Sequence, residues 1–158
     1  MELNNNKENS ELLQLVSFKI GNEEFGVDIL KVQEINKLVQ ITQVPSAPEF
    51  VDGVVNLRGR IIPIIDMRTR LQLPKKEHDK NTRIIIIELN NNTIGFIVDA
   101  VSEVLRISRD IIEEPPAISK GINAEYITAV AKLEDRLLIL LDLERLLTVE
   151  EETLAEVF

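Results

Sequence analysis

Two stretches of the chain repeat each other, and this internal repeat constrains the fold more than any other sequence feature. Residues 18–35 align without a gap on residues 87–104, and residues 50–67 align on residues 126–143. The second alignment has the larger offset, so the second copy carries a few extra residues in the stretch 107–125. Because an internal repeat sets the architecture before any single motif does, we expect two copies of one β-rich unit.

The repeat also predicts the domain organisation. We expect one domain over residues 13–147, made of two intertwined β-barrel subdomains at approximately residues 13–73 and 82–147. The polar residues 1–12 are expected to form a disordered arm. The acidic residues 148–158 are expected to form a tail or a short helix.

Each copy is predicted to begin and end with a β-hairpin, because apolar runs flank polar turns. The four predicted tips are Gly21 with Asn22, Asn90 with Asn91, Arg58 with Gly59, and Glu134 with Asp135. The closing strands, residues 61–65 and 137–141, are continuous apolar runs, which predicts burial on both faces. Short strands at regular spacing favour small barrels over a doubly wound sheet, so the expected fold class is all-β with short helices.

Asp66 and Asp142 follow the two closing strands at equivalent positions of the repeat. An aspartate before a short helical period caps the helix by accepting hydrogen bonds from free backbone N–H groups. Both aspartates are therefore interpreted as helix caps and not as catalytic groups. Residues 148–151 have the spacing of a capping box and predict a further helix start.

Composition limits the compartment and the partners. The chain has no cysteine, which leaves no disulfide framework and fits a reducing compartment. Its net charge is −9 and its aromatic content is 4%, whereas RNA-binding barrels present basic patches with stacking aromatics. No apolar run is long enough for a membrane helix, and the polar start does not resemble a signal peptide. We therefore expect a cytoplasmic protein that neither binds nucleic acid nor inserts into a membrane.

The sequence contains no convincing catalytic, metal-binding or cofactor-binding constellation. His78 is the only histidine and lies in a charged linker, which leaves a catalytic triad or a multi-histidine metal site without partners. Glycine-rich phosphate loops and zinc-protease motifs are absent from the sequence. Glu113 and Glu114 could do acid–base work only if burial raised the pKa of one of them, and adjacent loop carboxylates are usually solvated. We therefore expect no enzyme activity, no cofactor and no metal.

Positions where the two copies differ in charge are better candidates for function than positions where they agree. Arg58 at one hairpin tip aligns with Glu134 at the other, whereas Glu34 aligns with an acidic twin, Glu103. Arg58 is either an ordinary exposed turn residue or an interface anchor, since arginine offers a fixed charge and five donors. A Glu34–Arg58 pair across the first barrel is one arrangement that the sequence allows.

Three stretches carry motifs of a known family: residues 25–35, 48–66 and 95–101. The most specific motif is NLRGRIIPIID at residues 56–66. Together they resemble the CheW family of bacterial chemotaxis coupling proteins, and the likeness runs from about residue 15 to residue 147. The resemblance implies two five-stranded SH3-like β-barrels packed around a common core, with a short C-terminal helix.

The resemblance also implies partners and contact residues. Members bridge the cytoplasmic tip of methyl-accepting chemoreceptors to the regulatory domain of the histidine kinase CheA, without catalysis, in membrane-associated arrays. It assigns receptor contact to Val32, Glu34 and Arg58. Kinase contact maps onto Val27 and Leu30, which could equally be core residues.

Other functions remain open at this point. A CheV-like adaptor and a detached kinase regulatory domain would share the same fold. An RNA-binding small β-barrel is the alternative from a different class, and an enzyme that uses Glu113 and Glu114 is the third.

Overall fold

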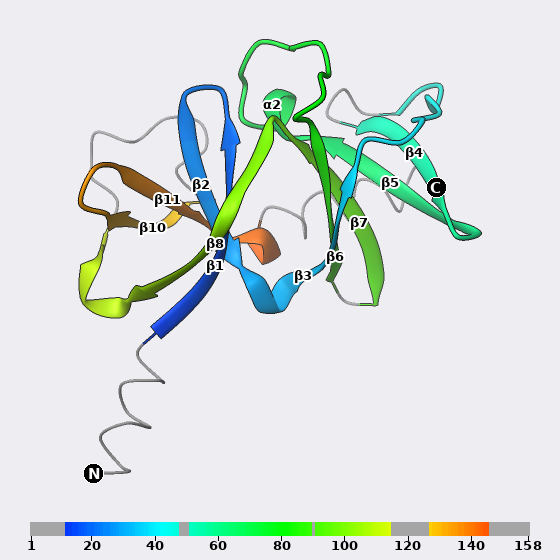
Figure 1. Cartoon of the computed structure of the whole chain (residues 1–158). Helices are drawn as coiled ribbons and strands as arrows, with labels where there is room; N and C mark the ends of the chain where they lie inside the picture. The colour runs from blue at the N-terminus through cyan, green and yellow to red at the C-terminus, as the bar shows by residue number, and fades with distance from the viewer. Residues whose placement is uncertain (1–11, 48–50, 90, 115–126, 146–158) are drawn as a thin grey trace.

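The computed structural model describes residues 12–47, 51–89, 91–114 and 127–145, which form eleven β-strands in two sheets (Figure 1). The prediction of an all-β fold with short helices is confirmed. Most of the predicted arm, the tip residue Asn90 and the predicted acidic tail lie outside the described residues.

The first sheet has six strands in the order β8-β1-β2-β11-β10-β9. They are β1 (Leu12–Ile20), β2 (Glu23–Asp28), β8 (Ala100–Ser108), β9 (Ile112–Glu113), β10 (Ile127–Lys132) and β11 (Leu137–Leu141). Neighbours are antiparallel except β2 and β11, which run parallel with Gly26 opposite Leu140. The short strand β9 is the one strand beyond the five expected for this barrel.

The second sheet has the five strands expected, in the order β3-β6-β7-β5-β4. They are β3 (Val32–Lys37), β4 (Val51–Leu57), β5 (Arg60–Asp66), β6 (Arg83–Leu89) and β7 (Asn92–Val98). The parallel pair here is β5 and β7, with Ile64 opposite Gly95. Ile64 aligns with Leu140 and Gly95 with Gly26, so the two parallel pairings join equivalent residues of the repeat.

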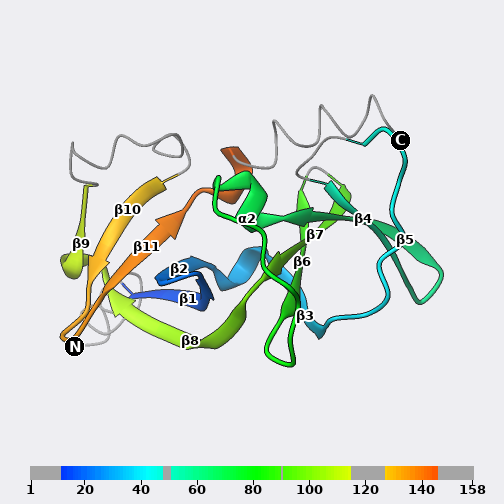
Figure 2. The ribbon, with the colours of Figure 1, turned by 90° about the horizontal axis from the view of Figure 1, so that it is seen from above.

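Each sheet takes strands from both copies of the repeat. The first copy contributes β1 and β2 to the six-stranded sheet, where they pair with β8 and β11 of the second copy. It contributes β3, β4 and β5 to the five-stranded sheet, where they join β6 and β7 of the second copy. The sheets curl into two barrels that lie side by side when seen from above (Figure 2). Neither barrel is therefore made by one copy alone.

The predicted turn chemistry is found at the hairpin tips. Gly21 and Asn91 have positive φ angles of 63° and 67°, as tight turns require. At the β4–β5 tip both Arg58 and Gly59 have positive φ, and the β10–β11 tip is closed by a hydrogen bond from Leu133 N–H to the Arg136 carbonyl (2.9 Å).

Short helices follow the strands where the aspartates predict them. Asp66 caps α2 (Met67–Arg70) by accepting from Arg68 N–H at 2.9 Å. Asp142 accepts from Arg145 N–H at 3.1 Å in the helical turn 143–145. Both predicted caps are confirmed, while the capping box at residues 148–151 lies outside the described residues. Two further turns are 3₁₀-helical, η1 (Ile29–Lys31) and η2 (Arg109–Ile111).

The prediction that both closing strands are buried on both faces is correct except at their first residues. Ile61 and Leu137 are 63% and 57% exposed, although the runs that follow them are buried or half-buried. Each residue follows the arginine that comes directly after a hairpin tip, Arg60 in one copy and Arg136 in the other. The exposed positions are equivalent in the two copies of the repeat.

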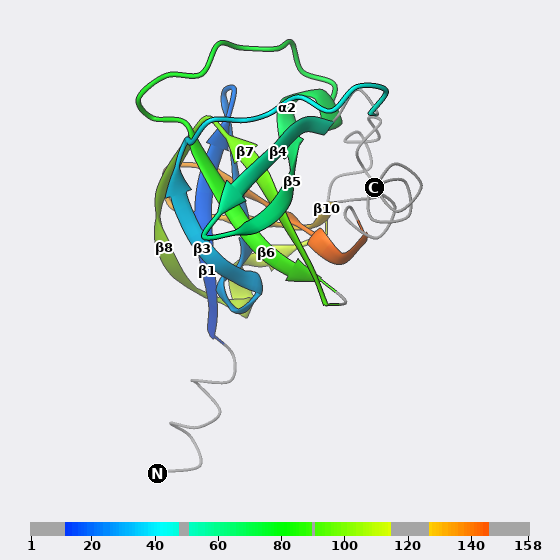
Figure 3. The same cartoon turned by 90° about the vertical axis from the view of Figure 1, so that its right-hand side faces the viewer.

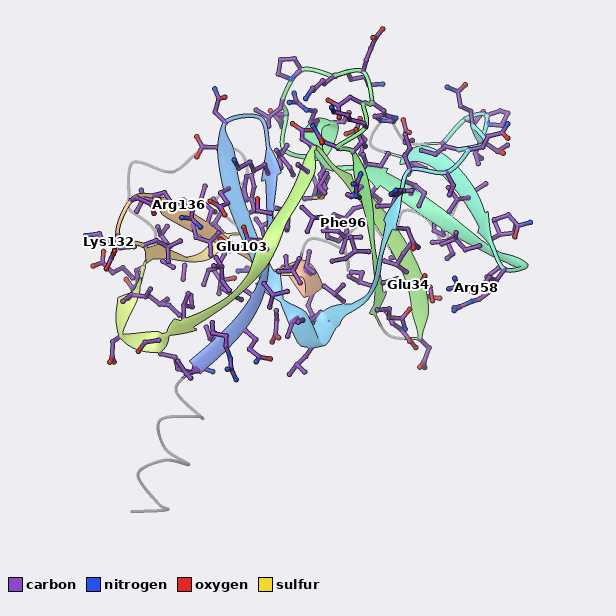
Figure 4. All side chains as sticks on the ribbon, in the orientation of Figure 1. Glu34, Arg58, Phe96, Glu103, Lys132 and Arg136 are labelled. Carbon is purple, nitrogen blue, oxygen red and sulfur yellow. The ribbon has the colours of Figure 1, made fainter. Side chains whose placement is uncertain are left out.

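One hydrophobic core is shared by the barrels and contains residues from both sheets. Phe18 of β1 lies with its ring centroid 5.8 Å from the centroids of both Phe25 and Phe96. Phe96 lies between the two barrels in Figure 4. A smaller cluster fills each barrel separately. Each barrel thus has a small core of its own and shares the larger cluster with the other barrel.

A single residue, Asp99, carries the chain from β7 in one sheet to β8 in the other. Its carboxylate accepts from Arg68 (Nε 2.9 Å, Nη2 2.6 Å) and from Gly21 N–H at 2.8 Å. Its N–H donates to the Lys19 carbonyl, and Arg68 also donates to the Pro74 carbonyl. Burial alone would raise the pKa of the Asp99 carboxyl, but the bonds from Arg68 and Gly21 outweigh it and lower that pKa.

The segment between α2 and β6 arches over this junction at the top of two perpendicular views (Figures 1 and 3). The longest helix in the described part of the chain is α2, with four residues, and none there could cross a membrane.

Candidate functional site

The β4–β5 hairpin presents Arg58 at its tip. Leu57 and Arg60 are the last paired residues, so the turn consists of Arg58 and Gly59 alone. Their φ angles of 52° and 83° are those of a type I′ turn, which matches the twist of a two-residue hairpin. The Asn56 side-chain oxygen accepts from Gly59 N–H at 3.0 Å and holds the turn closed. The backbone therefore fixes the point from which the guanidinium starts.

From this tip Arg58 reaches across the open side of the five-stranded barrel to Glu34 on β3. The Arg58 guanidinium donates to a Glu34 carboxylate oxygen and forms an ion pair, and Figure 4 shows the two side chains pointing toward one another. The other Glu34 oxygen accepts from Asn36 Nδ2 at 3.1 Å. The side chain of Arg58 is 71% exposed and that of Glu34 is 30% exposed. The Glu34 carboxylate is thus held by two donors and mostly covered, whereas the Arg58 guanidinium is exposed to solvent.

Three neighbours set the charge state of this site. Hydrogen bonds from Arg58 and then from Asn36 lower the pKa of the Glu34 carboxyl, and the charge of Arg60 lowers it further. The bond to Glu34 raises the pKa of Arg58 in return. Both partners are therefore ionised across the physiological range.

Arg60 lies two residues beyond the tip and belongs to the same site. Its Nη2 donates to the Thr93 hydroxyl of β7. Within the described residues it forms no ion pair, unlike Arg58. Val32, at the start of β3, is half-buried, packs against the shared core and lies opposite Ile87 of β6. Val32 supports the strand that carries Glu34.

Exposed apolar side chains lie on the same elements. Ile61 follows Arg60 on β5, and Ile35, which is 40% exposed, follows Glu34 on β3. Leu30 of η1 is 87% exposed. Val27 is only 1% exposed and lies in the shared core, so its side chain cannot itself touch a partner in this structure. The two residues assigned to kinase contact thus lie in opposite environments.

The equivalent place in the six-stranded barrel is built differently. Arg136, the repeat equivalent of Arg60, donates to Glu24 (2.6 Å), Glu103 (3.0 Å) and Asp135 (2.9 Å). Glu24 is 8% exposed and also accepts from the buried Ser17 hydroxyl. One arginine here is held by three carboxylates.

The residues considered as catalytic or metal-binding candidates do not lie together in one site. Glu113 and Glu114 are exposed, and Glu113 forms an ion pair with Lys132 at 3.2 Å, as expected for solvated carboxylates. His78 lies with Asp52 beside an open hollow of about 320 Å³. Burial and then Asp66 raise the pKa of Asp52. Among the residues that the structure describes, no three His, Asp or Glu side chains are grouped to hold a metal ion.

The sequence is matched by a family model described as the CheW-like domain, over residues 14–151. This chain belongs to the CheW-like family. It is 41% identical to the chemotaxis protein CheW of Klebsiella aerogenes, over 90% of this chain and 86% of the relative. The crystal structure of the scaffolding protein CheW from Thermoanaerobacter tengcongensis superposes with a TM-score of 0.77 at 39% identity, covering 85% of this chain and 91% of that one.

A further relative shows that the CheW-like region also occurs within a longer chemotaxis protein. The chemotaxis protein CheV3 of Helicobacter pylori is 34% identical, and the match covers 85% of this chain but only 47% of that protein. The CheW match to Klebsiella aerogenes spans most of both chains. These comparisons identify the chain as a CheW-type chemotaxis scaffold or adaptor.

Sequence reasoning found Glu34 and Arg58 but missed two members of the site. Asn36 carries no charge difference between copies and no motif, so only the strand geometry reveals its bond to Glu34. Arg60 agrees with Arg136 in the repeat, and agreement was interpreted as a sign of a structural role. The signal that could have found Arg60 is the change in the residues around it, since Glu24 in one copy is replaced by Thr93 in the other.

Proposed function

We propose that this chain is a non-catalytic adaptor that couples methyl-accepting chemoreceptors to the histidine kinase CheA. Membership in the CheW-like family supports the proposal. The observation that links the proposed function to particular residues is the Glu34–Arg58 ion pair. It is present in the five-stranded barrel, whereas the six-stranded barrel has Glu134 at the equivalent tip. The adaptor works in the cytoplasm and is recruited to membrane-associated receptor arrays.

Receptor contact is proposed for Val32, Glu34 and Arg58. Arg58 supplies an exposed guanidinium, and arginines of this kind are enriched at interface hot spots. Glu34 holds that guanidinium in one direction, which reduces the side-chain entropy lost on binding. Val32 fixes the strand on the shared core.

Kinase contact is proposed for Leu30 directly and for Val27 indirectly. An apolar side chain as exposed as Leu30 gains free energy when a partner covers it. Val27 supports the preceding strand from within the core. The partner is the regulatory domain of CheA.

An adaptor of this kind holds two partners in fixed geometry on one stiff scaffold. The shared core and the Asp99 junction keep the barrels from moving independently. Signalling then requires that the receptor state changes the relative stability of the bound arrangements, because equal affinity for both states shifts no equilibrium. No catalytic step, cofactor or metal takes part in this proposal.

Calorimetric titration of the full chain tests the two contacts separately. One titrant is the isolated CheA regulatory domain, and the other is a fragment of the chemoreceptor cytoplasmic tip from the same organism. We expect saturable micromolar or tighter binding to both. Absence of binding to both would overturn the adaptor function.

Charge variants then test the receptor surface. Arg58→Asp should fold normally, because a charge at an exposed turn contributes little to stability, and should lose at least about tenfold in receptor affinity with kinase affinity unchanged. The double variant Glu34→Arg with Arg58→Glu restores the ion pair in reversed order and separates the loss of the pair from the loss of an exposed cation. Normal receptor-dependent kinase activation by Arg58→Asp would remove Arg58 from the site.

A further inference from the structure

We infer that Arg60 is a second arginine of the receptor-binding surface and that it binds a carboxylate supplied by the partner. This inference rests on the proposed function and deepens it, since it names the partner chemistry at one position. It is carried by a comparison of Arg60 with its repeat equivalent, Arg136.

The second copy of the repeat shows what a guanidinium at this position binds. Arg136 is surrounded by Glu24 on β2, Glu103 on β8 and Asp135 at the adjacent hairpin tip. All three contacts are carboxylates from this same chain. Charge-assisted bonds between arginine and carboxylate are the strong ones in proteins, and their planar geometry favours paired donors. The local charge of Arg136 is therefore fully compensated within the barrel.

Arg60 forms an ion pair with none of the residues at these three positions. The position of Glu24 is taken by Thr93, which offers one neutral hydroxyl that Arg60 uses. The position of Asp135 is taken by Gly59, which has no side chain. The third position is kept as Glu34, but its oxygens already accept from Arg58 and Asn36.

The surface around Arg60 also holds Arg58, Glu34 and Glu88, which lies opposite Thr93 on β6 and accepts from Gln33, but neither glutamate forms an ion pair with Arg60. Arg60 is exposed and close enough to lower the pKa of Glu34, so its charge is felt within the site. Ile61, the next residue along β5, is also exposed and supplies an apolar neighbour. An acidic side chain of a partner helix that lies on this surface would complete at Arg60 the arrangement that Glu24 and Glu103 make at Arg136.

Two variants test the inference by independent routes. Arg60→Gln removes the guanidinium, and Thr93→Glu places a carboxylate from this chain beside Arg60, as Glu24 lies beside Arg136. We expect each to weaken binding of the full chain to the receptor-tip fragment by about tenfold and to reduce the dependence of the affinity on NaCl concentration. Binding to the CheA regulatory domain should not change.

Matched controls separate this effect from charge and fold. Arg109→Gln makes the same change in net charge at an exposed cation of η2 and should leave receptor affinity unchanged. Thr93→Gln keeps the size of the glutamate without its charge and should bind as the wild type does. Circular dichroism and urea unfolding verify that all four variants are folded.

The outcomes distinguish a failure of this inference from a failure of the proposed function. Wild-type binding with Arg60→Gln and Thr93→Glu both within twofold of it would overturn the inference and leave the proposed function standing. Failure of the wild type itself to bind the receptor fragment would overturn the receptor part of the proposed function and this inference with it. Equal losses in Arg60→Gln and Arg109→Gln would reduce the effect to net charge and also overturn the inference.

Discussion

The β4–β5 and β10–β11 hairpins occupy equivalent places in the two barrels, yet the arginine that both copies have after the hairpin tip has different bonding partners in each. In the six-stranded barrel, Arg136 is closed in by carboxylates of its own chain, one of them buried. In the five-stranded barrel, Arg58 is paired with Glu34, Arg60 bonds the neutral Thr93 hydroxyl, and both arginines face solvent. At one end the arginine has carboxylate partners from its own chain, while at the other Arg60 has none.

The difference shows how a duplicated fold separates stability from binding. The residues that both copies keep, such as the glycines of the parallel pairings and the capping aspartates, build the barrels. Both copies have an arginine after the hairpin tip, but the residues around it differ. These neighbouring residues decide whether its charge is paired within the chain or is available to a partner.

The largest effect is expected where backbone segments touch in the five-stranded barrel only. Gly53 has φ of 153°, and a Cβ there would lie 2.3 Å from the Thr42 carbonyl oxygen, whereas the equivalent residue in the other copy is Ala129. Gly53→Ala should therefore lower the free energy of unfolding by about 3 kcal/mol in urea titrations. Ala129→Gly is the matched control and should cost no more than about 1 kcal/mol. A small effect of Gly53→Ala would mean that the backbone at Thr42 shifts to make room for the added Cβ at little cost in free energy.

A second comparison concerns the equivalent glycines of the parallel pairings. A Cβ on Gly95 would lie 2.6 Å from Ile64 Cδ1 among fully buried isoleucines, whereas a Cβ on Gly26 would come no closer than 3.1 Å to Leu138. Gly95→Ala should destabilise the fold by about 2 kcal/mol and Gly26→Ala by less than about 1 kcal/mol. Urea unfolding of the two variants side by side measures the difference, and equal losses would show that both barrels relax alike.

The two arginines should differ in their importance for stability. Arg136→Gln removes the charged partner of the buried Glu24, and we expect the urea midpoint to fall by about 0.5 M. Arg60→Gln removes only a bond to Thr93 and should leave the midpoint within error of the wild type. The reverse order would contradict the assignment of one site to stability and the other to binding.

The smallest expected effect is in the titration of Glu34. Its pKa is lowered below its ordinary value of 4.5, so the ion pair stabilises the fold above that pH and the stabilisation is lost as the pH falls through the lowered pKa. In Arg58→Gln the pKa of Glu34 should rise toward its ordinary value but stay somewhat low, because Asn36 and Arg60 remain. Carboxyl chemical shifts recorded by NMR against pH measure both values. An unchanged pKa in the variant would show that Arg58 does not contact Glu34 in solution.

The local features of the fold could be predicted from the sequence because they depend on neighbouring residues. Glycine and asparagine at the tips require positive φ, and the capping aspartates need only free N–H groups nearby. Although intertwined subdomains were expected, which strands pair between the copies could not be predicted, because alternation and apolar runs identify a strand without identifying its partner. The pairing of β2 with β11 is a property of the tertiary fold alone.

The candidate site was partly predictable for the same reason. The charge difference between Arg58 and Glu134 is visible in the repeat, and the Glu34–Arg58 pair that the sequence allowed is present in the structure, whereas a role of this hairpin tip in binding stays a prediction. The burial of Val27 could not be predicted, since it depends on tertiary packing: four consecutive residues of β2 are buried, and the strand lies between β1 and β11 in its sheet. Arg60 was overlooked because both copies have arginine at this position, and comparing single positions does not compare the residues around them.

The exchanged strands have a consequence for synthesis of the protein on the ribosome. Glu24 and its partner Arg136 are 112 residues apart, and β2 has no parallel neighbour until β11 has been made. Long-range pairing of this kind delays folding, because the chain between the partners must be available before the contact forms. A nascent chain that stops after the first repeat exposes β1 and β2 without the rest of their sheet. Premature termination should therefore yield a truncated chain that proteases degrade. Only full-length adaptors would then accumulate in a cell.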